Sequence, residues 1–380
     1  MIGIAAFSHF LGDFLGSMFK PMGPYFVEQF GISTATFGSV MALIASSASL
    51  LQIGFGLLYD GVRKDGLHIF WLLVAQMVVL ALAGFAPSFP VLGLLIFFVI
   101  LVNSAYHPLG ASLAGSSQRG RDIAIFSVFG TFGSALGPVF ITSFSSTLGF
   151  SRLWLVSVVA LAVLLPAGPK MARYEKVEIA PRRFPGFAAL KTLFPVFLVV
   201  LSRSFVMDLF HTYVPLFLGS KGASLITGGT VITLGMLFGM VTNFFGSTLI
   251  EKVGIFKINL AGFATMGIMG LLFFFLDSTL LRAACFIGFD AGAFLTMSAN
   301  IVEAQRRMPT NRAFASSVTM GFAWSIGGFL GAAYAGAFGN DVGFMILSLA
   351  CIALALSALM VFFSRKFRRL PRRERPGNPA

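Results

Sequence analysis

The sequence is short of charged residues. Only 11% of its 380 residues are Asp, Glu, Lys or Arg, whereas 57% are hydrophobic and the mean hydropathy is +0.89. A water-soluble protein of this length needs more charge to cover its surface. The composition therefore excludes an ordinary soluble protein and predicts a polytopic membrane protein.

Other features are missing as well. The two cysteines, Cys285 and Cys351, stand in apolar segments without the spacing of a disulfide framework or a metal cage. A nucleotide-driven pump would need a glycine-rich phosphate loop ending in Lys and Ser or Thr, and the sequence has none. We therefore expect no cofactor and no enzymatic activity.

Long apolar runs dominate what is there. None shows the alternating pattern of a lipid-facing barrel, so helices are the only reading compatible with a bilayer. We predict an all-α polytopic membrane protein with 12 transmembrane helices in two six-helix bundles around a central cavity. The runs long enough to cross a core of about 30 Å are 4–29, 33–59, 67–86, 90–116, 123–148, 151–168, 191–218, 223–250, 258–276, 279–303, 313–338 and 342–364.

The formal net charge of +13 raises the possibility of nucleic-acid binding, which the positions of the charges exclude. Most of the 27 Lys and Arg lie in alternate connections and in the C-terminal tail. This is the positive-inside pattern, so we predict that both termini are cytoplasmic. The basic tail is expected to meet solvent or lipid headgroups.

The chain also reads as a duplication. A polar stretch from Pro169 to Phe187 separates six apolar runs from six, and one constant shift then places Asp60 on Glu251 and Arg121 on Arg312. A repeat of this kind is typical of secondary transporters. The predicted organisation is an N-terminal bundle over 1–168, a cytoplasmic linker over 169–190, a C-terminal bundle over 191–364 and a basic cytoplasmic tail over 365–380.

Ionisable side chains well inside the apolar runs are confined to the first, fourth, seventh and tenth runs. A charge at bilayer depth costs roughly 3 kcal/mol or more, so it persists mainly beside a polar cavity. These four runs are therefore predicted to line a central pathway. The residues are His9, Asp13 and Lys20 in the first run, His107 in the fourth, Arg203, Asp208 and His211 in the seventh, and Asp290 in the tenth.

His9 and Asp13 are the candidates for proton coupling. A regular helix places His9, Asp13 and Lys20 within roughly 40° of one another. At one turn of separation a carboxylate can stabilise a protonated imidazole, and histidine titrates near physiological pH. We expect His107 to approach this pair, with Asn103 one turn before it and Pro108 leaving backbone carbonyls free. The alternative is a structural hydrogen-bond pair between helices.

The second half offers candidates for substrate binding. Asp208 and His211 share one helix face, and Arg203 points about 140° away from Asp208. Arg203 could pair with Asp290 or offer a positive charge to an anionic substrate, and the sequence leaves these alternatives open. The predicted substrate-cavity residues are Lys20, Asn103, Arg203, Asp208, His211 and Asp290.

Several motifs resemble those of a known family. The run GLLYDGVRK, residues 56–64, is similar to the loop signature of the major facilitator superfamily, although Gly61 replaces the usual Arg. The run 247–254 resembles a degraded copy of this signature. The His9-x-x-x-Asp13 pair, the Tyr106-His107-Pro108 triplet and the glycine-rich run 130–138 are similar to the fosmidomycin-resistance efflux family.

The resemblance implies further roles. The loop residues would form a cytoplasmic gate in which Asp60 pairs with Arg121, and the repeat predicts the same relation between Glu251 and Arg312. Gly133, Gly137 and Pro138 resemble the antiporter signature, for which close helix packing is the simpler interpretation. The predicted gate residues are Asp60, Arg63, Arg121, Glu251 and Arg312.

The leading hypothesis is a monomeric secondary transporter in a bacterial inner membrane. It would export a small toxic or drug-like compound in exchange for protons by alternating access. The alternatives are an inward symporter or facilitator for a nutrient, and an exporter of a divalent transition metal. The expected partners are a small-molecule substrate, protons and membrane lipid, without nucleic acid.

Overall fold

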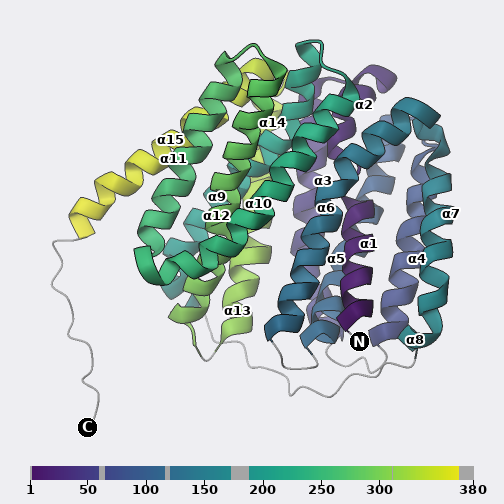
Figure 1. Ribbon diagram of the computed structural model, residues 1–380, viewed down its shortest axis with the longest axis horizontal. Coiled ribbons are helices and arrows are strands. Elements are labelled where there is room, and N and C mark those ends of the chain that lie inside the picture. Colours follow the sequence, from purple (N-terminus) through teal and green to yellow (C-terminus); the bar gives the residue numbers. More distant parts are fainter. Residues whose placement is uncertain (1, 60–64, 116–119, 173–187, 310, 368–380) are drawn as a thin grey trace, which may run out of the picture.

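The computed structural model of the protein describes all residues except 1, 60–64, 116–119, 173–187, 310 and 368–380, and the described residues with regular structure are helical (Figure 1). Eleven helical spans are long and apolar enough to cross a membrane, and Leu67–Ala83 is a shorter apolar helix. The predicted all-helical class with twelve spans is confirmed.

The first half of the chain supplies six spans. Its long helices are α3, α4, α5 and α6, and its first and sixth spans are built from shorter pieces. The elements are α1 (Ile2–Gly16), η1 (Lys20–Met22), α2 (Gly23–Phe30), α3 (Thr34–Tyr59), α4 (Asp65–Ala83), α5 (Phe89–Gly115), α6 (Gly120–Leu148), η2 (Phe150–Arg152), α7 (Leu153–Leu164), η3 (Leu165–Ala167) and α8 (Gly168–Ala172).

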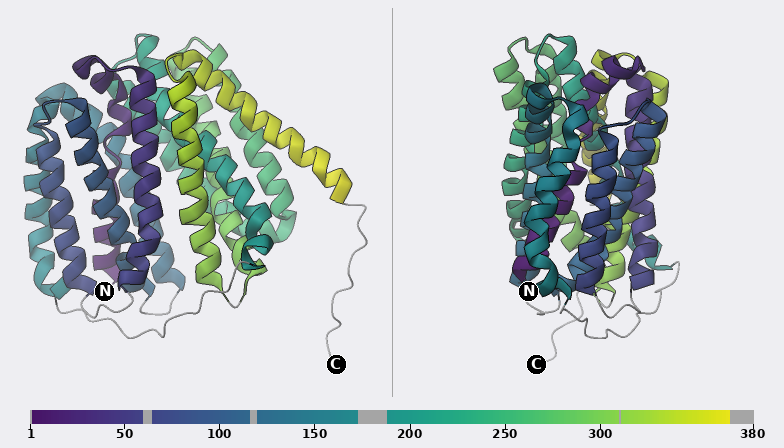
Figure 2. Two further views of the ribbon diagram at one scale, coloured as in Figure 1. Left: turned by 180° about the vertical axis from the view of Figure 1, so that it is seen from behind. Right: turned by 90° about the vertical axis from the view of Figure 1, so that its right-hand side faces the viewer.

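The second half repeats this arrangement. Figures 1 and 2 show the two halves side by side, with α15 leaning away from its neighbours toward its C-terminal end. The elements are α9 (Ala188–Ser220), α10 (Leu225–Val253), α11 (Ile255–Phe275), α12 (Thr279–Arg307), α13 (Arg312–Ser317), the π-helical turn η4 (Val318–Phe322), α14 (Ala323–Phe338) and α15 (Val342–Phe367).

The first span is not the regular helix that the sequence predicted over 4–29. It ends as α1 at Gly16 and restarts at Lys20 as η1, followed by α2. Pro21 and Pro24 have no backbone N–H to continue the helical ladder, which explains the break. A regular helix from His9 to Lys20, from which their shared stripe was predicted, is therefore not what the structure shows.

The two halves are joined at the end of the spans opposite to the N-terminus, which we call the distal end. There α3 packs against α14, and α6 against α10. The Thr34 hydroxyl donates to the Gly339 carbonyl at 2.6 Å, and the Ser39 hydroxyl to the Ala332 carbonyl at 2.9 Å. Among the described residues, the hydrogen bonds and the ion pair between the halves all lie toward this end.

Tyr213 of α9 fills the centre of the distal junction. Its hydroxyl donates to the Thr34 carbonyl at 3.2 Å. An ideal Cβ at Gly38 would lie 2.3 Å from that hydroxyl, and one at Gly339 would lie 2.0 Å from it. Both positions therefore require glycine for the halves to approach this closely.

Candidate transport site

Three ionisable side chains from two helices meet in the first half. His9 and Asp13 lie one turn apart on α1, and His107 comes from α5. The His9 Nε2 atom is 3.2 Å from Asp13 Oδ2, and His107 Nε2 is 3.4 Å from Asp13 Oδ1. The proximity expected for the three candidates is present, and we call them the His–Asp–His cluster.

A backbone carbonyl fixes the tautomer of His9. The Nδ1 atom lies 2.8 Å from the Phe126 carbonyl oxygen on α6, and because a carbonyl only accepts, Nδ1 carries the proton of that bond. In neutral His9 the Nε2 lone pair then faces a carboxylate oxygen. Two acceptors at this distance repel each other, so at least one proton must be shared between His9 and Asp13 when both stay in place.

Two further polar side chains hydrogen-bond the Asp13 carboxylate. The Asn103 amide on α5 donates to Asp13 Oδ1 at 3.0 Å, and the Ser134 hydroxyl on α6 donates to Asp13 Oδ2 at 3.4 Å. Asn103 was predicted as a cavity residue, whereas no role was predicted for Ser134, which lies within the glycine-rich run 130–138. Its hydroxyl could have been found by noting that it is the one polar side chain between Gly133 and Gly137.

Gln76 was missed entirely. It is fully buried on α4, and its amide donates to the Gly12 carbonyl on α1 at 2.9 Å. The sequence signal was an isolated glutamine inside the apolar run 67–86, which a search restricted to ionisable side chains passes over. Gly12 leaves room for the network, since an ideal Cβ there would lie 2.8 Å from the Asn103 Oδ1 atom.

The glycine motif of α6 faces α1. An ideal Cβ at Gly133 would lie 2.2 Å from the Phe10 carbonyl oxygen, and one at Gly137 would lie 1.9 Å from the Ser17 hydroxyl. Close packing, the simpler of the two interpretations, is thus what these glycines provide. Pro138 lies on the other side of the contact, where its carbonyl would be 2.6 Å from a Cβ at Gly229 of α10.

Lys20 contacts the other half of the chain. Its ammonium group pairs with the Asp208 carboxylate of α9, so that the break after α1 joins the two halves of the chain. Both side chains are partly exposed. Among the described residues this is the ion pair that crosses between the halves.

A second buried pair lies in the C-terminal half. The His211 Nε2 atom of α9 is 2.6 Å from Asp290 Oδ1 of α12, and Asp290 is 0% exposed. The Phe286 ring lies 5.2 Å from the His211 ring, centre to centre. Of the two alternatives left open for Arg203, the pair with Asp290 is not present, because Asp290 pairs with His211.

Arg203 points elsewhere. Its guanidinium lies 5.1 Å from the centre of the Trp324 ring, and one nitrogen lies 3.2 Å from the Met207 sulfur. The side chain is 2% exposed, and its Nε has no hydrogen-bond partner. Helix geometry gave its direction away from Asp208, but it did not identify an aromatic partner from a span more than a hundred residues further on.

The predicted gate is only partly described. Asp60 and Arg63 lie outside the described residues, as does the side chain of Arg312, while Arg121 is exposed at the start of α6. Glu251 pairs with Arg306 of α12 at 3.0 Å. The symmetric relation between the two gate pairs therefore stays a prediction.

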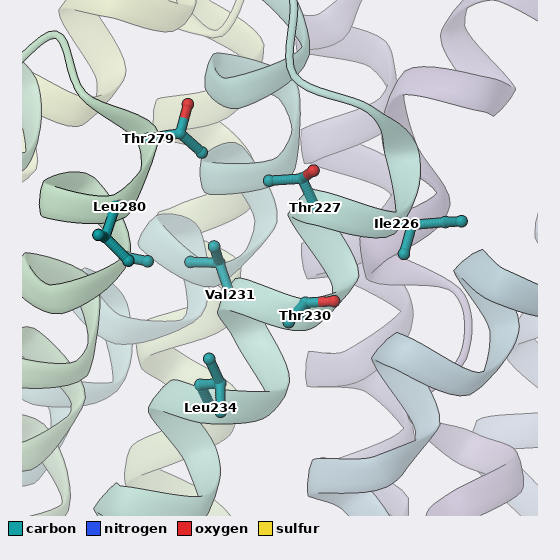
Figure 3. A pocket seen from close by; sticks show the side chains of 8 residues that line it. Ile226, Thr227, Thr230, Val231, Leu234, Thr279 and Leu280 are labelled. Carbon is teal, nitrogen blue, oxygen red and sulfur yellow. The ribbon is translucent and has the colours of Figure 1, made fainter.

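A shallow groove lies between α10 and α12, apart from these clusters (Figure 3). Its volume is about 360 Å³, and its wall contains no ionisable side chain. It is lined by Ile226, Thr227, Thr230, Val231, Leu234, Thr279, Leu280 and Ala283. This lining does not resemble the polar clusters described above.

Twelve spans in two similar halves, each with a buried polar cluster, define a membrane transporter rather than an enzyme. The chain belongs to the Major Facilitator Superfamily, whose family model matches residues 5–332.

Two bacterial proteins are similar to this chain in sequence. The chain is 25% identical to the fosmidomycin resistance protein of Escherichia coli (strain K12) over 389 residues, which cover 96% of this chain and 92% of that protein. It is 29% identical over 168 residues to the uncharacterized MFS-type transporter YfnC of Bacillus subtilis (strain 168), covering 43% of this chain and 40% of YfnC.

Solved structures share the fold. A POT family transporter in complex with a thioalcohol-conjugated peptide matches with a TM-score of 0.78 and 12% identity, covering 97% of this chain and 96% of that one. A bacterial homologue of the human lysosomal transporter Spinster matches with a TM-score of 0.77 and 15% identity, covering 97% of each chain. At these identities the likeness concerns the fold alone.

Proposed function

We propose that the protein exports a small toxic or drug-like compound in exchange for protons. The observation that carries this proposal is the His–Asp–His cluster, whose geometry calls for a proton shared between His9 and Asp13 at membrane depth. Intramembrane ionisable residues of this kind are typical of proton pathways. The contacts of His9, His107, Asn103 and Ser134 all converge on the Asp13 carboxylate, so a change in its protonation would alter all four.

The proposed mechanism is alternating access between the two halves. Their junction at the distal end supports a state that is closed there. If both termini are cytoplasmic, the distal end is the outer face, and this state receives substrate from the cytoplasm. Protons and substrate would each prefer one of two states, which is the requirement for coupling.

The substrate is proposed to bind between the halves, where charges from both meet. Lys20 and Asp208 come from opposite halves, and Arg203, His211 and Asp290 add charge from the second half. Fosmidomycin is the first compound to test, because the relative that matches across 96% of the chain is a fosmidomycin resistance protein. We further propose that the protein acts as a monomer in a bacterial inner membrane.

Transport by purified protein in proteoliposomes tests this function. We expect an imposed pH gradient to drive fosmidomycin, or another compound from a toxic panel, against the direction of proton flow. Asp13→Asn should abolish this dependence on the gradient, whereas Glu28→Gln, at an exposed carboxylate on α2, should retain it. Movement of every compound irrespective of the gradient would remove the coupling, and movement together with protons would favour an inward symporter.

A further inference from the structure

We propose that His9, Asp13 and His107 also bind one divalent transition metal ion, in competition with protons. The binding does not depend on the proposed function, whereas its consequence for transport rests on it. The ion is proposed as a ligand that occupies the proton site and so inhibits proton-driven transport, rather than as its cargo.

The ligand atoms have the spacing that a metal centre requires. His9 Nε2, His107 Nε2 and a carboxylate oxygen of Asp13 all lie within 4.8 Å of one another. The two nitrogen-to-oxygen distances are 3.2 and 3.4 Å. Two ligands on a tetrahedral zinc ion with bonds of about 2.0–2.1 Å are separated by about 3.3 Å, so each histidine already stands at that spacing from Asp13, and metal binding would bring the two imidazole nitrogens to it as well.

The groups around the ligands support the same reading. Metal-binding histidines usually donate their other ring N–H to a carbonyl or carboxylate, which aims the remaining lone pair at the metal. His9 does this through Nδ1 and the Phe126 carbonyl at 2.8 Å. Asn103 holds Asp13 in place at 3.0 Å, so one histidine and the carboxylate are already oriented.

The described side chains that hydrogen-bond within and around the cluster, apart from its own three members, are uncharged, so they would not repel a metal cation. Of the elements packed against it, α5 adds Tyr106, whose hydroxyl bonds Ser8, and α4 adds the neutral Gln76. Other titratable groups on these elements stand near their ends: Arg121 and Asp122 open α6, and His68 lies near the start of α4. Lys20, which follows α1, is paired with Asp208.

The donor set selects the class of ion. Two imidazole nitrogens and one carboxylate oxygen suit zinc, cobalt and nickel, whereas magnesium and calcium prefer oxygen alone. Thiolate-seeking ions find no sulfur here, because both cysteines lie in the second half of the chain. The His107 side chain is 28% exposed, which gives an ion a route to the site.

Binding is tested on tag-free protein by calorimetry with Zn²⁺ and by the absorption spectrum of Co²⁺. We expect one ion per chain, with an affinity that falls as the pH drops below about 7, because the ligands must lose protons to bind. His107→Gln, which keeps a similar size, should weaken binding by about tenfold or more. His68→Gln, at an exposed histidine outside the cluster, should leave it unchanged.

Thermal unfolding gives a second readout, because a cooperative transition without Zn²⁺ also shows that the variant is folded. Zn²⁺ should raise the melting temperature of the wild type and of His68→Gln, and leave that of His107→Gln unaffected. Equal binding by wild type and His107→Gln, or no binding at one ion per chain, would overturn the metal site. Binding without inhibition of proton-driven transport would uphold the site and count against the coupling role of the cluster.

Discussion

Gly130 of α6 lies directly against the imidazole of His9. An ideal Cβ at this position would be 2.3 Å from Cε1 of the ring and 2.4 Å from Nε2. The ring is fixed from its other nitrogen by the Phe126 carbonyl, so it has little freedom to move aside. A backbone position on one helix thus determines where the proton-accepting atom of another helix can stand.

Gly130→Ala should therefore displace His9 from Asp13. Overpacking of this kind costs about 1–3 kcal/mol, and a coupling free energy of that size corresponds to about 5- to 150-fold. We expect the response of transport to a pH gradient to decrease by a factor within this range. Gly3→Ala on α1, where an added Cβ meets nothing within 4 Å, is the control. Retention of full coupling by Gly130→Ala would show that His9 does not need this position.

The Lys20–Asp208 pair should act as a bond between the two halves. Lys20→Met or Asp208→Asn alone leaves its partner without an opposite charge, and both variants should weaken closure of the distal end. The double variant is expected to be less impaired than the sum of the two, with a coupling energy of about 0.5–3 kcal/mol. A double-mutant cycle on thermal stability and transport measures it, and strict additivity would contradict a direct interaction.

Gly38→Ala should oppose closure of the distal end, because the added methyl group would overlap the Tyr213 hydroxyl. A cysteine pair at Ser39 and Ala332, in a background without the two native cysteines, reports that closure by disulfide formation. We expect slower cross-linking in Gly38→Ala than in Gly54→Ala, which lies on the same helix and meets nothing within 4 Å. Equal rates would indicate that the halves tolerate the extra atom.

The His211–Asp290 pair should be costly to break from one side. Removing one partner of a buried pair costs about 3–5 kcal/mol, whereas replacing both by apolar side chains is often nearly neutral. Asp290→Ala should therefore lower the melting temperature more than the double variant His211→Phe with Asp290→Leu. Glu28→Ala, at an exposed carboxylate on α2, should stay within about 0.5 kcal/mol of wild type. A double variant less stable than Asp290→Ala would reject this account.

Sequence periodicity predicted which spans carry the polar residues but not every partner. His9, Asp13 and His107 come together as expected, because two residues one turn apart share a helix face whatever the surrounding fold. The regular helix expected between Asp13 and Lys20 is interrupted because Pro21 and Pro24 cannot continue the helical ladder of α1, and those prolines were visible in the sequence. The break could have been predicted by applying proline chemistry before extrapolating the helix.

Partners across long sequence distances were not accessible in the same way. A helix position gives the direction of Arg203 within its own span, yet not which neighbouring span it meets. Trp324 was therefore missed, and so was the pairing of Asp290 with His211. The glycine contacts of α6 were predicted as packing, but their relation to His9 required the relative height of two helices, which periodicity does not provide.

The distal junction has a property that matters for repeated turnover. Three of its hydrogen bonds run from a side-chain hydroxyl to a helix or helix-end carbonyl: those of Thr34, Ser39 and Tyr213. A hydroxyl released from such a bond can rotate to another acceptor, and each bond contributes only about 0.5–1.5 kcal/mol net. Under the proposed alternating access, these hydrogen bonds would therefore add little to the barrier for opening the distal end and could re-form each time it closes.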